Sequence, residues 1–362
     1  MGDNVNKLIS VPQLITLLII NRIVISMTFG SSSIGGYNIW DCIISSVVVF
    51  FASFILVLPI LSLCNNENGL DIVDLNEQIL GKFGKVFSVI YSFYFILVCA
   101  HALSTFKIFI TSVIDPPISF LVLATSIIVF ACYASSKGIE SIARTSSIIL
   151  FFISFLLVFI GFSLFKLSDF TNFRPFFYDG YNSFKNGSIF MISRMSCIPA
   201  MGMLISMSKG NIKKGILVWN IITCLLMVSC IFFVTGVLGD LSLVKLFPIY
   251  TSTSVAKISK FENLDFLYIG LWTSAVFLKI SMFLNLSSEC LRKSFGKKNN
   301  KIIIFLLGMA LIFVNMFSKM SNIFKGIFDT NIFLILTVST SFVIPCILLI
   351  CKKRGKNEKI KL

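Results

Sequence analysis

Residues 187–208 read GSIFMISRMSCIPAMGMLISMS, an apolar run that SRMS at positions 193–196 interrupts and Pro199 follows. Residues 11–33 read VPQLITLLIINRIVISMTFGSSS, in which Arg22 precedes a cluster of hydroxyl side chains. Charged and hydroxyl groups are costly inside an apolar run that is long enough to cross a membrane. The two interruptions therefore mark the positions most informative about fold and function.

These two runs belong to a series of ten apolar runs. The chain has 362 residues, of which 56% are hydrophobic and 13% charged, and its mean hydropathy is +0.94. A soluble domain would have to expose such side chains to water. About twenty residues in a helix cross a hydrocarbon core of ~30 Å, and lipid offers the backbone no hydrogen-bond partner. The sequence thus predicts a single-domain, all-α integral membrane protein with spans at 11–30, 39–63, 86–110, 117–136, 145–167, 187–208, 214–239, 264–288, 301–318 and 329–351.

The distribution of basic residues predicts the orientation. The formal net charge is +15. With a cytoplasmic N-terminus, 19 Lys and Arg residues fall on the inner side and 8 on the outer side. The positive-inside rule then favours cytoplasmic locations for both termini. The basic tail is not expected to bind nucleic acid, because no recognition fold surrounds it.

The two interrupted runs occupy corresponding places if the chain consists of two five-helix halves, at about 9–167 and 187–351. Paired breaks of this kind indicate a transporter-like fold with inverted repeats. Unwound helix halves would leave N–H and C=O groups that can hold the carboxylate and ammonium of a zwitterion. The alternative is that Pro199 only kinks a helix and that the serines bond back to their own backbone.

Four ionisable side chains within the predicted spans are candidates for a functional role, and two of them belong to the interrupted runs. Arg22 could bind a carboxylate or face the cytoplasmic vestibule, and Arg194 lies beside the proposed break. Lys279, about fifteen residues into the eighth span, could replace a coupling cation, pair with carbonyls of the first span, or extend to cytoplasmic water. His101 could carry a proton, or it could simply be hydrogen-bonded inside the bundle.

The two longest connections also differ in character. Residues 64–85 combine acidic side chains with the glycine-bracketed stretch 81–85 and predict a short amphipathic helix on the cytoplasmic face. Residues 240–263 are expected outside. No nucleophile–base constellation, nucleotide-binding loop or metal-ligand spacing occurs, so we expect neither an enzyme nor a bound cofactor or metal.

Several segments, in order along nearly the whole chain, resemble the B subunits of spore germinant receptors. The most specific is Tyr133–Arg144, YASSKGIESIAR; the others are Ile9–Leu14, Ile79–Lys85, Phe247–Tyr250 and Leu264–Ser281. The resemblance implies the amino acid/polyamine/organocation transporter fold, with ten helices in two inverted repeats. It also implies a receptor in the inner spore membrane that binds a nutrient, usually an amino acid, and signals to A and C subunits.

When the family's ligand-binding positions are transferred to this sequence, the ligand is expected near the two breaks and beside Lys279. With Arg22 included, the predicted ligand-binding residues are Arg22, Val24, Ser26, Thr28, Ser193, Arg194, Ser196 and Lys279. Val24 stands where many members have glycine, and Arg194-Met195-Ser196 replaces their Gly-Glu pair, so the ligand's charge preference should differ. A proton-coupled or lysine-surrogate amino acid permease is the alternative function, and an ion channel is a third.

Overall fold

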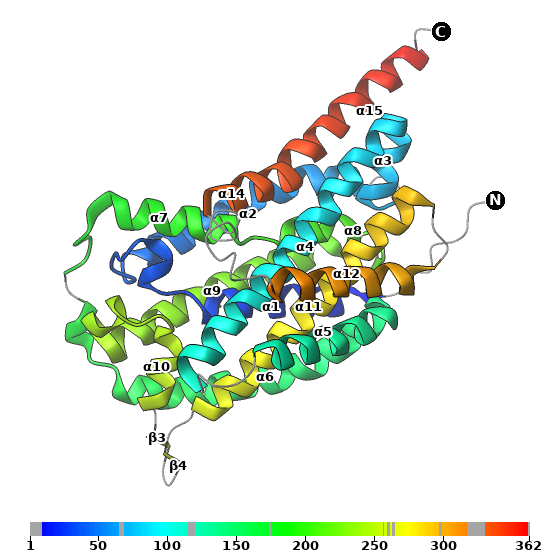
Figure 1. The fold of residues 1–362 in the computed structure, drawn as a ribbon. Helices are drawn as coiled ribbons and strands as arrows, with labels where there is room; N and C mark the ends of the chain where they lie inside the picture. The colour runs from blue at the N-terminus through cyan, green and yellow to red at the C-terminus, as the bar shows by residue number, and fades with distance from the viewer. Residues whose placement is uncertain are drawn as a thin grey trace.

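The computed structural model describes residues 9–64, 69–114, 120–173, 175–255, 257–258, 261–262, 265–296, 299–316 and 330–360. Helices follow the apolar runs in order (Figure 1). The principal ones are α1 (Val11–Met27), α2 (Cys42–Cys64), α4 (Gly84–Phe109), α5 (Phe120–Ser136), α6 (Ile139–Leu167), α7 (Gly180–Ser193), α8 (Cys197–Leu204), α9 (Ile212–Leu238), α11 (Asp265–Phe295), α12 (Asn300–Met316), α14 (Thr330–Val338) and α15 (Ile344–Ile360).

Shorter elements connect these helices. They are β1 (Ile9–Ser10), η1 (Ser31–Ile34), α3 (Ile72–Leu80), η2 (Gly81–Phe83), η3 (Ile110–Ile114), η4 (Phe170–Phe173), β2 (Ser208–Lys209), η5 (Gly239–Leu243), α10 (Pro248–Val255), β3 (Lys257–Ile258), β4 (Phe261–Glu262) and η7 (Ser339–Val343). Both η3 and η7 are π-helical, whereas η1, η2, η4 and η5 are 3₁₀ turns.

The predicted all-α membrane fold is confirmed. Among the described residues, seven helical segments are long and apolar enough to cross a membrane, and α1, α5 and α12 contribute shorter apolar helices. Three helices extend well beyond their predicted spans: α15 extends to Ile360, α6 begins at Ile139, and α11 extends to Phe295. Their extra turns contain polar residues that lower hydropathy, yet Ile142 and Cys290 within them are buried against protein. Positions 317–318 and 329 of the last two predicted spans lie outside the described residues.

The two halves of the chain follow the same order of long and short helices. In the first half the short helix α3 lies between the second and third apolar helices, α2 and α4. In the second half α10 occupies the same place, between α9 and α11. This correspondence supports two five-helix repeats, whose bounds at 9–167 and 187–351 remain a prediction.

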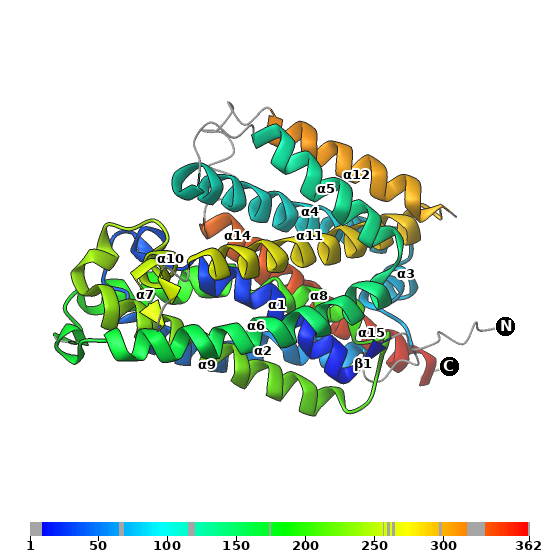
Figure 2. The ribbon, with the colours of Figure 1, turned by 90° about the horizontal axis from the view of Figure 1, so that it is seen from below.

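The centre of the bundle is formed by α1 and α8. All eight residues of α8 are buried, as is every residue of α1 from Leu17 to Met27. In Figure 2, α6 and α9 lie on one side of α1, and α11, α4, α5 and α12 lie on the other. Exposed aromatic side chains such as Phe151 and Phe155 cover the outside of α6, as expected for a surface that faces lipid.

The beginning of α1 is tied to the end of α8. Ser10 caps α1 in a capping box with Gln13, and Pro12 occupies the first turn, where its missing N–H has no cost. In a short parallel pair, Ile9 and Ser10 lie opposite Ser208 and Lys209. The segment before α1 is thus paired with the segment that follows α8. Figure 2 shows β1 at the same end of the bundle as α15.

The predicted amphipathic helix within 64–85 is present as α3. It ends at Gly81, whose φ of +58° favours glycine, and Gly84 lies against the backbone of Asn76. At its start, Lys293 of α11 bridges the carboxylates of Asp71 and Asp74, with Nζ–Oδ2 distances of 2.5 and 2.6 Å. Burial raises the pKa of Asp71 to about 6. The helix is therefore packed into the bundle rather than resting on a lipid surface alone.

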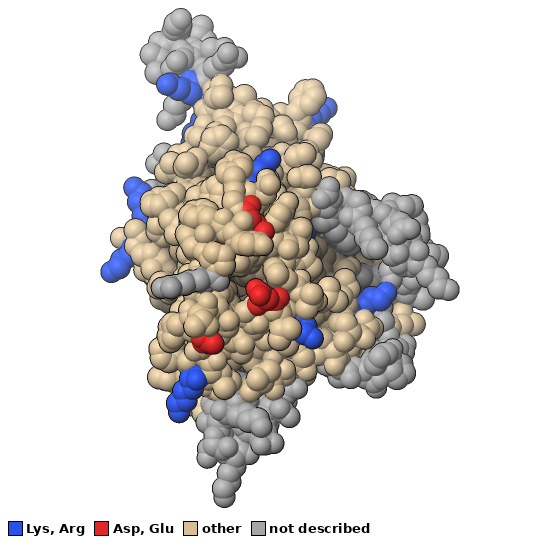
Figure 3. Space-filling view, turned by 90° about the vertical axis from the view of Figure 1, so that its left-hand side faces the viewer, with Lys and Arg blue, Asp and Glu red and all other residues tan. Residues whose placement is uncertain are grey.

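The stretch that carries the most specific resemblance forms the turn between α5 and α6. Gly138 has a φ of +89° and directly precedes α6. Ser135 donates from its hydroxyl to the carbonyl of Ser281 at 2.7 Å, and its own carbonyl accepts from the side-chain amide of Asn285 at 3.0 Å. These bonds fix the turn to α11. The opposite end of the bundle, around α7 and α10, presents mostly uncharged atoms with scattered Lys, Arg, Asp and Glu (Figure 3).

Candidate ligand site at the helix break

The predicted break in the sixth span is confirmed. The regular helix of α7 ends at Ser193 and α8 begins at Cys197, leaving Arg194, Met195 and Ser196 between them. Pro199 has no N–H to donate to the carbonyl of Met195, which instead accepts from the N–H of Ile198 at 3.1 Å. The break is therefore encoded by the proline together with the polar residues that precede it.

The predicted break in the first span is displaced. We expected it near Val24 to Thr28, but α1 is regular through Met27, so Val24 and Ser26 are helical. The hydroxyl of Ser26 donates to the carbonyl of Arg22 at 3.2 Å, and that of Thr28 donates to the carbonyl of Val24 at 3.0 Å. Bonding of this kind satisfies hydroxyl groups inside a helix without opening the helix. The position predicted for the break in the first span was therefore wrong.

The helix ends where the chain meets the α10 segment. Thr28 is the C-cap residue of α1, and Gly30 adopts an extended conformation before η1. A Cβ atom at Gly30 would lie 2.9 Å from Cδ of Pro248, so only glycine fits without displacement. The hydroxyl of Tyr268 donates to the carbonyl of Met27 at 2.7 Å. The last carbonyl of α1 is thereby satisfied by α11.

A buried amide joins α1 to the break. Asn21, which is fully buried, donates from its side chain to Oγ of Ser196 at 3.2 Å and lies 3.0 Å from Sγ of Cys197. The thiol of Cys197 in turn donates to the carbonyl of Leu18 at 3.3 Å. Sequence reasoning missed Asn21, although an amide beside Arg22 in an apolar run was a detectable signal. Of the predicted residues, Ser196 is the one that this network contains.

Arg22 lies at the carboxyl end of α7. Its side chain is 3% exposed, and one terminal nitrogen donates to the carbonyl of Met191 at 3.3 Å. A cation at this position interacts favourably with the negative end of the helix dipole. Its Nε has no hydrogen-bond partner among the described residues and borders a cavity of only about 10 Å³. The position suits a residue that holds α7 in place.

Arg194 lies among aromatic rings on the other side of the break. Its guanidinium carbon is 4.4 Å from the ring centroid of Phe333 and 5.6 Å from that of Phe190. The imidazole of His101 packs edge-on against Phe333, with 5.4 Å between centroids. A cation over aromatic faces is stabilised by their quadrupoles. Helices α4, α7 and α14 therefore converge on Arg194.

Ser193 connects the break to two further helices. Its hydroxyl donates to the carbonyl of Phe190 at 2.7 Å, and its carbonyl accepts from the hydroxyl of Thr337 at 2.9 Å. Thr337 is also 2.9 Å from the hydroxyl of Tyr94. The hydroxyl of Tyr91 donates to the carbonyl of Thr340 within the π-helical segment η7. Two irregular segments, α7–α8 and η7, thus share one buried polar network.

Lys279 is 5% exposed and makes no hydrogen bond or ion pair with any described residue. It lies on α11, a helix that contacts both α1 and α8. Arg22 and Arg194 lie near the break between α7 and α8. Val24 and Ser26 are helical residues of α1, and the hydroxyls of Ser26 and Thr28 donate to carbonyls of that helix.

The amino end of α8 offers donors of its own. The N–H groups of Ser196 and Cys197 donate to no backbone carbonyl of the described residues. Free N–H groups and the positive end of the helix dipole favour an anion. The cations and N–H groups around the break are therefore those that a small anionic group would need as partners.

Comparisons with known proteins agree with the resemblance described in the sequence analysis. The family model described as spore germination protein matches residues 8–324. Spore germination protein KB of Bacillus subtilis (strain 168) is 22% identical over 368 residues, covering 98% of this chain and 97% of that protein. Spore germination protein XB of Bacillus anthracis is 25% identical over 257 residues, covering 68% and 69%. With its apolar helices and its broken α7–α8 segment, the chain belongs to the spore germination protein family of integral membrane proteins.

Proposed function

We propose that this protein is a nutrient germinant receptor subunit that binds a small molecule, of which an amino acid is the leading candidate, between α1 and the α7–α8 break. The observation that carries the proposal is Lys279, a residue that is 5% exposed on α11, which contacts α1 and α8, and that has no hydrogen bond or ion pair among the described residues. A buried unpaired charge is costly, so it is expected where a ligand or a proton completes it.

The ligand's carboxylate would lie at the N–H groups of Ser196 and Cys197, with Lys279 opposite. Arg194 would set the preference for the rest of the ligand, and Asn21 and Arg22 would hold the two helices around it. Ligand binding would stabilise one arrangement of the helices, and partner subunits, the A and C proteins of a receptor complex in the inner spore membrane, would respond to that population shift. On this proposal the protein catalyses no reaction.

Purified full-length protein in liposomes tests the proposal. We expect saturable binding of a labelled amino acid without accumulation inside the vesicles. Arg194→Ala should change ligand preference or abolish the germination response while expression persists, and Arg144→Ala, at an exposed pair with Glu140, is the matched control. An unchanged dose–response for Arg194→Ala would remove this residue from the site.

The alternative is an amino acid permease, and the same residue favours it. An unpaired ammonium in the interior, such as that of Lys279, could act as a fixed substitute for a coupling cation. Net accumulation of a labelled amino acid in the liposomes, lost in Lys279→Met and retained in Lys137→Met, would support the permease and contradict the receptor proposal.

A further inference from the structure

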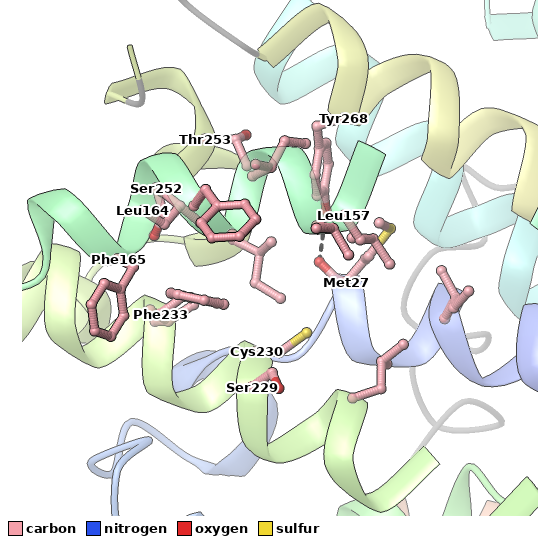
Figure 4. A pocket seen from close by; sticks show the side chains of 18 residues that line it. Met27, Leu157, Leu164, Phe165, Ser229, Cys230, Phe233, Ser252, Thr253 and Tyr268 are labelled. Atoms are coloured by element: carbon pink, nitrogen blue, oxygen red, sulfur yellow. Dashed lines mark hydrogen bonds between the residues drawn. The ribbon is translucent and has the colours of Figure 1, made fainter. Parts of the chain in front are cut away.

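A cavity of about 580 Å³ lies away from the helix break, between α1, α6, α9, α10 and α11 (Figure 4). We call it the α6–α9 groove. Its walls are almost entirely apolar and include Ile23, Met27, Phe162, Phe233 and Tyr268. Its volume is within the range of small-molecule sites, but its lining lacks the convergent polar groups that orient a zwitterion.

The few polar atoms in the groove are already bonded. The hydroxyl of Ser229 donates to the carbonyl of Leu225 at 2.8 Å, and that of Ser252 donates to the carbonyl of Pro248 at 3.0 Å. Thr253 is bonded in the same way to its own helix, and Tyr268 to Met27. A polar occupant would lose its hydration without gaining partners, so the groove suits hydrocarbon.

The mouth of the groove opens onto the outside of α6. Val158 is 60% exposed, Phe162 is 70% exposed, and both lie in a segment that the fold places against lipid. Residues four apart share a face of a helix, so Val158, Phe162 and Lys166 form one row along α6, in which Val158 and Phe162 line the groove and Lys166 follows one turn beyond them. Lys166 is exposed and lies in the last turn of α6.

The dimensions of this row match those of one membrane leaflet. Eight residues separate Val158 from Lys166, which is about 12 Å at ~1.5 Å per residue. Half of a ~30 Å hydrocarbon core is about 15 Å. A chain lying along the row would therefore place a phosphate near the ammonium of Lys166, where the opposite charges attract.

We propose that the α6–α9 groove binds a membrane phospholipid, with an acyl chain against Phe162 and Phe233 and the phosphate at Lys166. The inner wall of the groove is Met27 and Tyr268, the hydrogen-bonded pair that ends α1. A bound acyl chain stabilises the conformation it binds, so it supports the end of α1, the helix that also carries Asn21 and Arg22. The membrane's lipids thereby act on the same helix as the ligand.

The test counts phospholipids retained by the full-length protein, using native mass spectrometry after extraction from nanodiscs of phosphatidylglycerol and phosphatidylethanolamine. Ser229→Trp places a large side chain in the groove. Its matched control is Ser126→Trp, because Ser126 is also exposed and also bonded to its own helix. Lys166→Gln removes the headgroup contact, and the exposed Lys185→Gln is its control.

We expect one tightly retained phospholipid in the wild type and in both controls. Ser229→Trp and Lys166→Gln should each lower its occupancy several-fold while the elution profile on gel filtration stays that of the folded protein. Equal occupancy in all five proteins, or no retained phospholipid in the wild type, would overturn the proposal. A protein helix or a second copy in the groove would leave the lipid count unchanged in Ser229→Trp and would overturn it as well.

Discussion

Replacing Gly84 by alanine should break the junction between α3 and α4. A Cβ atom at Gly84 would lie 2.0 Å from the carbonyl oxygen of Asn76 and 2.3 Å from its carbonyl carbon. Both atoms belong to backbone, so no side-chain rotation can relieve the overlap. The helix α3 would have to move away from α4, and with it the carboxylates that Lys293 bridges.

The expected loss of stability in Gly84→Ala can be compared with the effect of the same glycine-to-alanine change elsewhere in the protein. Overpacking costs roughly 1–3 kcal/mol, and more where the backbone must move. Alanine in place of glycine in an open helix gains up to about 1 kcal/mol. Gly270 of α11 provides that reference, because a Cβ atom there would meet nothing within 4 Å. Gly84→Ala should therefore destabilise the protein, whereas Gly270→Ala should leave it unchanged or stabilise it.

The assay is the thermal unfolding midpoint of each purified protein in one detergent, followed by tryptophan fluorescence. A free-energy change of 1 kcal/mol corresponds to about 2–4 °C or less in a chain of this size. We expect the midpoint of Gly84→Ala to fall below the wild-type value. The midpoint of Gly270→Ala should match or exceed the wild-type value. Shifts of the same sign and size in both variants would refute the packing argument.

Three further outcomes are expected from the same measurement. Tyr268→Phe should lower the midpoint by the equivalent of about 1–3 kcal/mol, because it leaves the buried carbonyl of Met27 without a donor; no change would mean that another donor reaches this carbonyl. Lys279→Met should raise the midpoint, because it removes a buried ammonium that has no partner among the described residues; a fall would show that the charge is compensated. Burial raises the pKa of Asp71 to about 6, so its contribution to stability is fully present below its ordinary pKa near 4 and is lost as pH rises through 6. Asp71→Asn, which can still cap α3, should flatten that part of the pH profile, and an unchanged profile would contradict the assignment.

Hydropathy and length predicted the helices of the bundle because the membrane imposes them. A chain in lipid must satisfy its backbone within each span, so an apolar run of twenty residues has few conformations available. The same reasoning identified the α7–α8 break, because Pro199 removes a backbone donor at a defined place. Helix ends that lie in water or against other parts of the protein, such as the first turns of α6, depend on packing. The sequence predicted their positions less accurately.

The interruption in α1 could not be located from composition because hydroxyl side chains are ambiguous. Ser26 and Thr28 looked like the edges of an unwound segment, yet both bond to carbonyls of their own helix. Just beyond the end of α1, Gly30 lies against Pro248, which is more than two hundred residues away in the chain. A partner so distant leaves no local signal. Asn21 did leave a local signal, an amide within an apolar run, but its partners Ser196 and Cys197 are 175 and 176 residues away in the chain.

The end of α1 and the start of α8 differ in which of their backbone groups are already bonded, and this bears on the ligand. At the end of α1, the carbonyl of Met27 is taken by Tyr268 and that of Ile25 by the N–H of Thr28. At the start of α8, the N–H groups of Ser196 and Cys197 donate to no backbone carbonyl of the described residues. Donors and cations thus outnumber free acceptors at the site. On the proposed function, the ligand's negatively charged group fixes the position of the ligand. An ammonium group of the ligand would need acceptors that only a rearrangement of α1 could supply. Recognition of that ammonium would then be coupled to movement of α1, the helix that must carry the signal.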